Sequence, residues 1–258
     1  MYAATVLVGC NKKPDSNYVK SIEVVNFNAA IGNITDFKTI NFPSKDGLNI
    51  TADLYLIKKP KNFILLCHQA GFSRGEYIET AKKLNKLGYS CMAIDQRSGN
   101  VANNVINQTA KLAKNDGVEV KTYLDVKPDI EAAINYVYKM NKSKPIIIVG
   151  SSYSASLSLL LAVNNDKIKA VAAFSPGEYL KGLNLANAIA ALDKPLFVTS
   201  SKKEIKSVEV LISKVKSKKI TQFKPKVKSI HGSRALWSKT IGNQDCWKSF
   251  RAFLKELK

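Results

Sequence analysis

Histidine is scarce in this chain: His68 and His231 are the only two among 258 residues. Imidazole is the commonest general base in enzymes and a frequent metal ligand, so a site of either kind has few places to form. The chain also has only four cysteines and no C-x-x-C pair, which argues against a zinc centre or a dithiol redox site. We therefore expect neither a metal nor a cofactor.

Long apolar runs are missing too, since no segment reaches the 18 or so residues needed to cross a bilayer as a helix. Arginine is rare: 4 of the 40 basic residues are arginine, although the net charge is +20. Arginine is the usual residue for bidentate phosphate and base contacts, so we expect no nucleic-acid partner. The densest lysine region, 202–228, could help to hold the protein near an anionic membrane.

The regular pattern that is present alternates strands with helices. Short runs rich in apolar and β-branched residues predict strands at 36–42, 48–57, 63–67, 89–94, 145–149, 168–174, 195–199 and 220–223. Apolar residues at helical spacing predict helices at 74–87, 128–140, 153–163, 208–215 and 243–257. This order predicts an α/β fold with about eight strands, an antiparallel start and helices on both faces. Segment 101–123 has no clear period, and we expect it to pass over the strand ends. Segment 179–192 is expected to be a weak helix or a loop, again near the strand ends that hold the site.

One stretch carries the strongest chemical signal. A run of β-branched residues ends at Gly150, Ser152 follows two positions later, and a helical pattern begins at once. A serine on such a strand–turn–helix corner is held exposed above the sheet, as in the pattern G-x-S-x-G. Here the pattern reads Gly150-x-Ser152-x-Ser154, with a small residue in the last place. Ser152 is the candidate nucleophile.

Several motifs together resemble the α/β-hydrolase superfamily, and among its members the dienelactone-hydrolase-like serine hydrolases of bacteria. The resemblance covers roughly residues 35–258. Dienelactone hydrolases proper use cysteine as the nucleophile, so lactone specificity is not implied here. The matching segments are His68-Gln-Ala-Gly71, Asp95-Gln-Arg-Ser-Gly99, Gly150-x-Ser152-x-Ser154, Ser200-Ser-Lys-Lys-Glu204 and His231-Gly232.

The resemblance implies a Ser–acid–His triad in that chain order. His231 lies after Ser152, in a loop before the last predicted helix, and is the candidate base. Glu204 is the only acid in the loop after strand 195–199 and is the candidate orienting acid. Glu178, after strand 168–174, is the alternative acid. His68 precedes the nucleophile, and we expect it to be structural.

The oxyanion hole of such enzymes uses two backbone N–H groups. One is expected from Tyr153, the residue after the nucleophile. The other is expected from the loop after strand 63–67, with Ala70 as the first choice and Gln69 as the alternative.

The segment Leu7-Val8-Gly9-Cys10 resembles the lipobox of bacterial lipoproteins. The resemblance implies a signal remnant and tether at 1–20, a lipid on Cys10, membrane attachment and a place in the cell envelope. Without that modification the expected location is the cytoplasm. Residues 21–258 would form one hydrolase domain.

These features predict a serine hydrolase that cleaves a carboxylic ester or related acyl bond of a small-molecule substrate, through an acyl-enzyme on Ser152. Peptidase or thioesterase activity would use the same machinery. The alternative from a different class is a binding or accessory protein at the cell surface that keeps the scaffold but has lost efficient catalysis, since Ser154 departs from the pattern.

Overall fold

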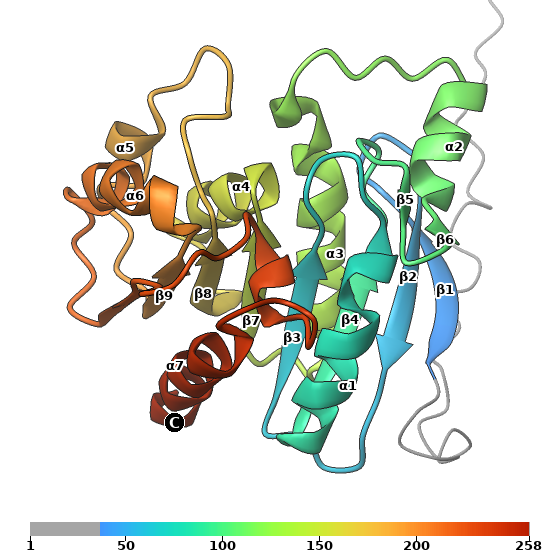
Figure 1. Cartoon of the computed structure of the whole chain (residues 1–258). Coiled ribbons are helices and arrows are strands. Elements are labelled where there is room, and N and C mark those ends of the chain that lie inside the picture. The colour runs from blue at the N-terminus through green and yellow to red at the C-terminus, as the bar shows by residue number, and fades with distance from the viewer. Residues whose placement is uncertain (1–36, 258) are drawn as a thin grey trace, which may run out of the picture. The chain divides into compact units, whose positions relative to one another are not determined.

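An eight-stranded sheet forms the centre of the computed structural model, which describes residues 37–257 (Figure 1). The strand order is β1-β2-β4-β3-β7-β8-β9-β10. A separate two-stranded hairpin is made by β5 and β6. The strands are β1 (Lys38–Pro43), β2 (Asn49–Tyr55), β3 (Asn62–Cys67), β4 (Tyr89–Ile94), β5 (Val101–Ala102), β6 (Val105–Ile106), β7 (Ile146–Ser151), β8 (Ile168–Phe174), β9 (Leu196–Thr199) and β10 (Ile220–Phe223).

The sheet begins antiparallel and continues parallel, as predicted. Strand β2 pairs antiparallel with both β1 and β4, and every pair from β4 to β10 is parallel. The turn between β1 and β2 closes at Gly47, whose φ of 89° suits a residue without a Cβ. The parallel strands therefore end along one edge of the sheet, where an α/β fold places its ligands.

Helices cover both faces of the sheet. Residues of α1 and α7 pack with one buried cluster, and those of α2, α3, α4, α5 and α6 pack with the other. In Figure 1, α1 and α7 lie in front of the sheet. The helices are α1 (Ile78–Lys86), α2 (Gln108–Asn115), α3 (Lys127–Met140), α4 (Tyr153–Ala162), α5 (Leu185–Ala188), α6 (Ile205–Ile212) and α7 (Asn243–Glu256), with short 3₁₀ turns at Arg74–Tyr77, Tyr123–Val126, Lys202–Glu204 and Ser233–Leu236.

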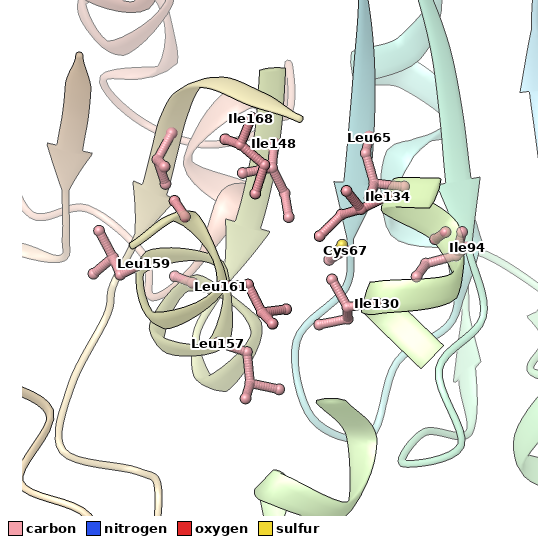
Figure 2. Packing of buried hydrophobic residues seen from close by; sticks show 14 of the residues in the cluster. Leu65, Cys67, Ile94, Ile130, Ile134, Ile148, Leu157, Leu159, Leu161 and Ile168 are labelled. Atoms are coloured by element: carbon pink, nitrogen blue, oxygen red, sulfur yellow. The ribbon is translucent and has the colours of Figure 1, made fainter. Parts of the chain in front are cut away.

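The central strands are buried on both faces, which explains their unbroken apolar sequences. All six residues of β4 and all six of β7 are buried. Figure 2 shows one of the two clusters, where Ile130 and Ile134 of α3 and Leu157 of α4 pack with Leu65 of β3 and Ile148 of β7. The strand carrying the candidate nucleophile is thus anchored in the middle of the core.

Segment 101–123 contains more structure than the sequence predicts, whereas segment 179–192 agrees with the weak helix or loop expected there. Segment 101–123 holds the β5–β6 hairpin and α2, which Asn107 caps by accepting a hydrogen bond from the Ala110 N–H. Segment 179–192 holds the short helix α5. Helix α6 begins three residues earlier than expected. The predicted domain boundary at residue 20 and the lipidation site Cys10 lie outside the described residues.

Residues 37–257 include no helix that is both long and apolar enough to cross a bilayer.

Candidate active site

The backbone at Ser152 makes a sharp corner between β7 and α4. Its φ of 59° and ψ of −124° are unusual for a residue with a side chain. Such a conformation costs about 1–3 kcal/mol and persists only where the surroundings impose it. The Ser152 N–H donates to Phe174 O on β8, and the Ser152 carbonyl accepts the Ala155 N–H of α4. The corner lifts the hydroxyl above the carboxyl end of β7.

The two flanking positions of the motif have different requirements. A Cβ at Gly150 would lie 2.4 Å from Ser154 O and 2.6 Å from the Ala155 backbone, so only glycine fits there. Ser154 is fully buried, donates to His68 O at 2.5 Å and accepts from Gln96 Nε2 at 2.6 Å. The departure from G-x-S-x-G therefore adds two buried hydrogen bonds between α4 and the loops after β3 and β4.

His231 and Glu204 lie together at the same edge of the sheet. The distance between His231 Nδ1 and Glu204 Oε1 is 2.5 Å, although 27 residues separate them. Glu204 ends the 3₁₀ turn after β9, and His231 lies in the loop after β10. Because Nδ1 faces the carboxylate, Nε2 is the nitrogen left to act as a base. That nitrogen has no hydrogen-bond partner in the described part of the chain.

The second oxygen of Glu204 is held by three further donors. Glu204 Oε2 accepts from the Ser201 N–H at 2.9 Å, from the Ser201 hydroxyl at 2.7 Å and from the Ser175 hydroxyl at 2.9 Å. Burial raises the pKa of this carboxyl, but the hydrogen bonds with His231 and Ser201 outweigh burial and lower the pKa to about 2. Glu204 is thus a fixed carboxylate at neutral pH.

Glu178, the alternative acid, faces a different part of the fold. Its carboxylate accepts the Leu185 N–H at 2.7 Å and the Ala186 N–H at 3.0 Å, at the start of α5. Carboxylates satisfy free amides at the start of helices in this way. The structure therefore brings Glu204, and not Glu178, to His231.

The candidate oxyanion amides differ in their availability. The Gln69 N–H donates to Glu76 Oε2 at 2.8 Å, so it is already engaged. The Ala70 and Tyr153 N–H groups have no acceptor within the described residues. Both follow the carboxyl ends of neighbouring strands, β3 and β7. Ala70 is accordingly better placed than Gln69 to serve as the second donor.

Glu76 connects the loop after β3, which holds Gln69 and Ala70, to the loop after β10, which holds His231. It is fully buried, and its Oε1 accepts the Ser233 hydroxyl at 2.5 Å while its Oε2 accepts the Gln69 N–H. Burial raises the pKa of this carboxyl. The Ser233 N–H in turn donates to Ser151 Oγ at 2.9 Å. The residues on both sides of the candidate site are therefore parts of one hydrogen-bonded unit.

Gly232 leaves no space for a side chain. A Cβ there would lie 2.5 Å from both Gln69 Oε1 and Ser151 Oγ, and the φ of 77° also favours glycine. The Gly232 N–H donates to Ser175 Oγ at 3.0 Å. The loop that carries His231 is thereby fixed directly after the histidine.

His68 has a structural role. It is fully buried, and desolvation lowers its pKa to about 4, so the ring is neutral at pH 7. Its Nδ1 lies 2.8 Å from Gln69 O, and its Nε2 accepts the Gln96 N–H at 3.0 Å. The ring connects the loops after β3 and β4. The second loop is fixed further by Arg97, which pairs with Asp129 of α3 at 2.6 Å.

Tyr179 is a site residue that the sequence reasoning did not single out. Burial raises its pKa first, and the negative charge of Glu204 raises it further, while a side-chain hydrogen bond with Ser152 acts in the opposite direction. The ring lies edge-on to His231, with centroids 6.5 Å apart. The Tyr179 side chain therefore lies close to both Ser152 and His231.

One signal could have identified the residues that were missed. Ser175 and Tyr179 follow the carboxyl end of β8, the strand next to the nucleophile strand, where functional loops gather. Ser175 also adopts a positive φ of 53°, which the sequence does not reveal. No group of three or more His, Cys, Asp or Glu side chains suited to hold a metal ion is found within residues 37–257.

Comparisons with solved structures give the same fold. The Pyrococcus furiosus esterase Pf2001 superimposes with a TM-score of 0.68 at 17% identity, over 86% of this chain and 93% of that one. A dienelactone hydrolase from Anabaena variabilis gives 0.67 at 11% identity, over 87% and 99%. A carboxyl esterase from Bacillus coagulans gives 0.62 at 11% identity, over 86% and 98%. At these identities the likeness concerns the fold.

A search of curated proteins finds no match. The sequence does match a family model, that of the serine aminopeptidases S33, over residues 58–247, which is well over half of the chain. The matched region includes the Ser152 corner, Glu204 and the His231 loop. The protein is therefore an α/β-hydrolase that belongs to the serine aminopeptidase S33 family.

Proposed function

We propose that the protein is a serine hydrolase that cleaves carboxylic esters through a triad of Ser152, His231 and Glu204. The observation that carries the proposal is the 2.5 Å contact between His231 Nδ1 and Glu204 Oε1, which leaves Nε2 free to act as a base. The nucleophile proposed for it is Ser152, on its strained corner. A serine hydroxyl is a weak nucleophile and needs such a base, itself oriented by a carboxylate.

In the proposed reaction, Ser152 Oγ attacks the carbonyl carbon while His231 Nε2 takes the hydroxyl proton. The Ala70 and Tyr153 N–H groups stabilise the oxyanion of the tetrahedral intermediate. The ester C–O bond then breaks, and His231 returns the proton to the leaving alcohol, which leaves an acyl group on Ser152. Water then attacks the acyl group on Ser152 in the same way, and the carboxylic acid is released. Glu204 stays ionised and stabilises the imidazolium.

Ester cleavage is preferred as the activity because the solved structures with this fold include several esterases. The family name points to amide substrates as well, and the same residues could cleave an amide if the leaving amine is protonated. The two activities are separated by comparing p-nitrophenyl acyl esters with aminoacyl p-nitroanilides. We expect kcat/KM for the esters to be the larger.

Covalent labelling tests the nucleophile. A fluorophosphonate should label the wild-type chain, and tandem mass spectrometry should locate the adduct on Ser152. Ser152→Ala should abolish both labelling and ester cleavage. Ser156→Ala is the matched control, because Ser156 lies in the same helix and its hydroxyl donates to Gly177 O. Labelling that persists in Ser152→Ala would show that another residue is the nucleophile.

A further inference from the structure

Nine lysines lie in three loops at the edge of the sheet opposite the candidate active site. Loops 58–61, 141–145 and 213–219 precede β3, β7 and β10 at their amino ends. They contain three, two and four lysines, respectively, and no acid. Among the described residues, none of these nine lysines has an acidic partner within ion-pairing distance. The cations of this edge are thus free to attract an external anion.

The other two loops at this edge add no surplus charge. Lys194 lies 3.7 Å from Asp166 and 3.8 Å from Asp193, and these aspartates are the only acids in loops 163–167 and 189–195. We call the edge formed by loops 58–61, 141–145 and 213–219 the lysine edge. In Figure 1 this edge runs from the lower end of the sheet, where β3 begins, to the left side, where loop 213–219 follows α6.

The opposite edge is closer to balance. The long segment 95–126 has four basic and four acidic residues, and loop 175–184 has one of each. The exceptions are loop 200–204, with two lysines and one acid, and loop 224–242, with five basic residues and no acid. Loop 224–242 supplies a control, because its lysines lie at the active-site edge and carry the same charge as those of the lysine edge.

A groove of about 860 Å³ runs between α1 and α7, from Ser238 and Asn243 at one end to Lys86 and Lys255 at the other. Five basic side chains line it and no acid does, although Lys83 also pairs with Glu79 at 2.6 Å. Since helices run antiparallel to the strands in this fold, the last turns of α1 and α7 reach the lysine edge. The basic lining residues are Lys83, Lys86, Lys248, Arg251 and Lys255.

We propose that the lysine edge is a docking surface for an anionic phospholipid bilayer. Exposed lysines next to such a surface are attracted by its negative potential within about one Debye length. Lysine, a strongly hydrated point charge, suits a diffuse layer of headgroups better than bidentate base or phosphate recognition, which favours arginine. Strand β1 also starts here, at Lys38, so the chain preceding the domain joins it on the side that would face the membrane. Ser152 would then face away from the lipid.

Vesicle partitioning tests the proposal with the full chain carrying Cys10→Ser, so that no lipid can be attached. Mixed phosphatidylglycerol and phosphatidylcholine vesicles should bind the protein, phosphatidylcholine alone should not, and added salt should weaken binding. Each lysine near the surface changes the partition coefficient roughly fivefold. Lys216→Glu with Lys218→Glu should therefore lower it at least about 25-fold. Lys142→Glu with Lys144→Glu should act similarly.

The matched control is Lys226→Glu with Lys228→Glu, which changes the net charge by the same amount at the opposite edge. We expect less than about a threefold effect on partitioning. Thermal melting of each variant confirms that it is folded. Equal effects of the two kinds of variant, or no preference for anionic vesicles, would overturn the proposal. So would tighter binding to a duplex DNA oligonucleotide than to the vesicles at the same salt. None of these results depends on ester cleavage.

Discussion

The Ser175 hydroxyl donates a hydrogen bond to Glu204 Oε2 at 2.9 Å and accepts one from the Gly232 N–H at 3.0 Å. A single side chain thus connects the carboxylate of the candidate triad to the residue that follows His231. Its oxygen fixes the acid relative to the base, because it holds both loops at once.

Ser175→Ala should weaken this connection. We expect kcat/KM to fall about tenfold, which is the size of effect expected for one lost hydrogen bond to a charged group. The pKa of Glu204 should rise from about 2, because one donor to the carboxylate is gone. Ser200→Ala is the control, since the Ser200 hydroxyl donates to Ser201 O and does not contact Glu204.

Ser175→Ala should also change how the free energy of unfolding depends on pH. The pKa of Glu204 is below the ordinary glutamate value of 4.5, so the carboxylate stabilises the fold above about pH 4.5, and this contribution is lost as the pH falls towards 2. In Ser175→Ala the loss should be smaller, because the shift is smaller. Denaturant unfolding across this range measures it. If the free energy of unfolding depends on pH in the variant as it does in the wild type, Ser175 does not stabilise the charge of Glu204.

Glu204→Gln and Glu178→Gln should separate the two candidate acids. A glutamine at 204 cannot stabilise the imidazolium, and we expect kcat to fall by about 10³–10⁴, as for the equivalent change in serine proteases. Glu178→Gln should leave kcat within about twofold and cost at most about 1 kcal/mol of stability, since it affects only the start of α5. The opposite ranking in a steady-state assay would assign the acid to Glu178.

Tyr179→Phe removes a hydroxyl that is placed to hydrogen-bond with Ser152 and keeps the ring edge-on to His231. We expect kcat to fall about threefold to tenfold with little change in KM, because one neutral hydrogen bond contributes about 0.5–1.5 kcal/mol. The rate of fluorophosphonate labelling should fall in parallel. Tyr136→Phe, which alters a ring stacked on Phe42 away from the site, should change neither rate. If both variants behave alike, Tyr179 has only a packing role.

Ser154→Gly would restore the G-x-S-x-G pattern, yet it should destabilise the protein. The variant loses the hydrogen bonds to His68 O and from Gln96 Nε2, and unpaired buried groups cost about 1–3 kcal/mol. Ser158→Ala should cost less, because the Ser158 hydroxyl bonds only to Ser154 O within the same helix. Denaturant unfolding compares the two. A Ser154→Gly variant as stable as the wild type would show that these bonds contribute nothing net.

The sequence was sufficient for the order of elements because buried parallel strands are apolar throughout and helices have one apolar face. It failed where packing with distant residues decides local structure. Helix α2, for example, has few buried residues, and it is fixed by distant partners: Thr109 Oγ1 accepts the Thr51 N–H, and the Gln108 N–H donates to Asp95 Oδ2.

The candidate site residues also differ in whether the sequence alone could identify them. The nucleophile candidate Ser152 and the base candidate His231 could be chosen from the sequence, because glycine at 150 marks a tight corner and histidine is scarce. Only the tertiary structure decided between Glu204 and Glu178, since both lie in loops after strands and differ only in where their carboxylates point. Likewise, only the fold shows which lysines lie at the lysine edge and which lie at the active-site edge. Loops that are far apart in the sequence come together at the edge where the parallel strands begin.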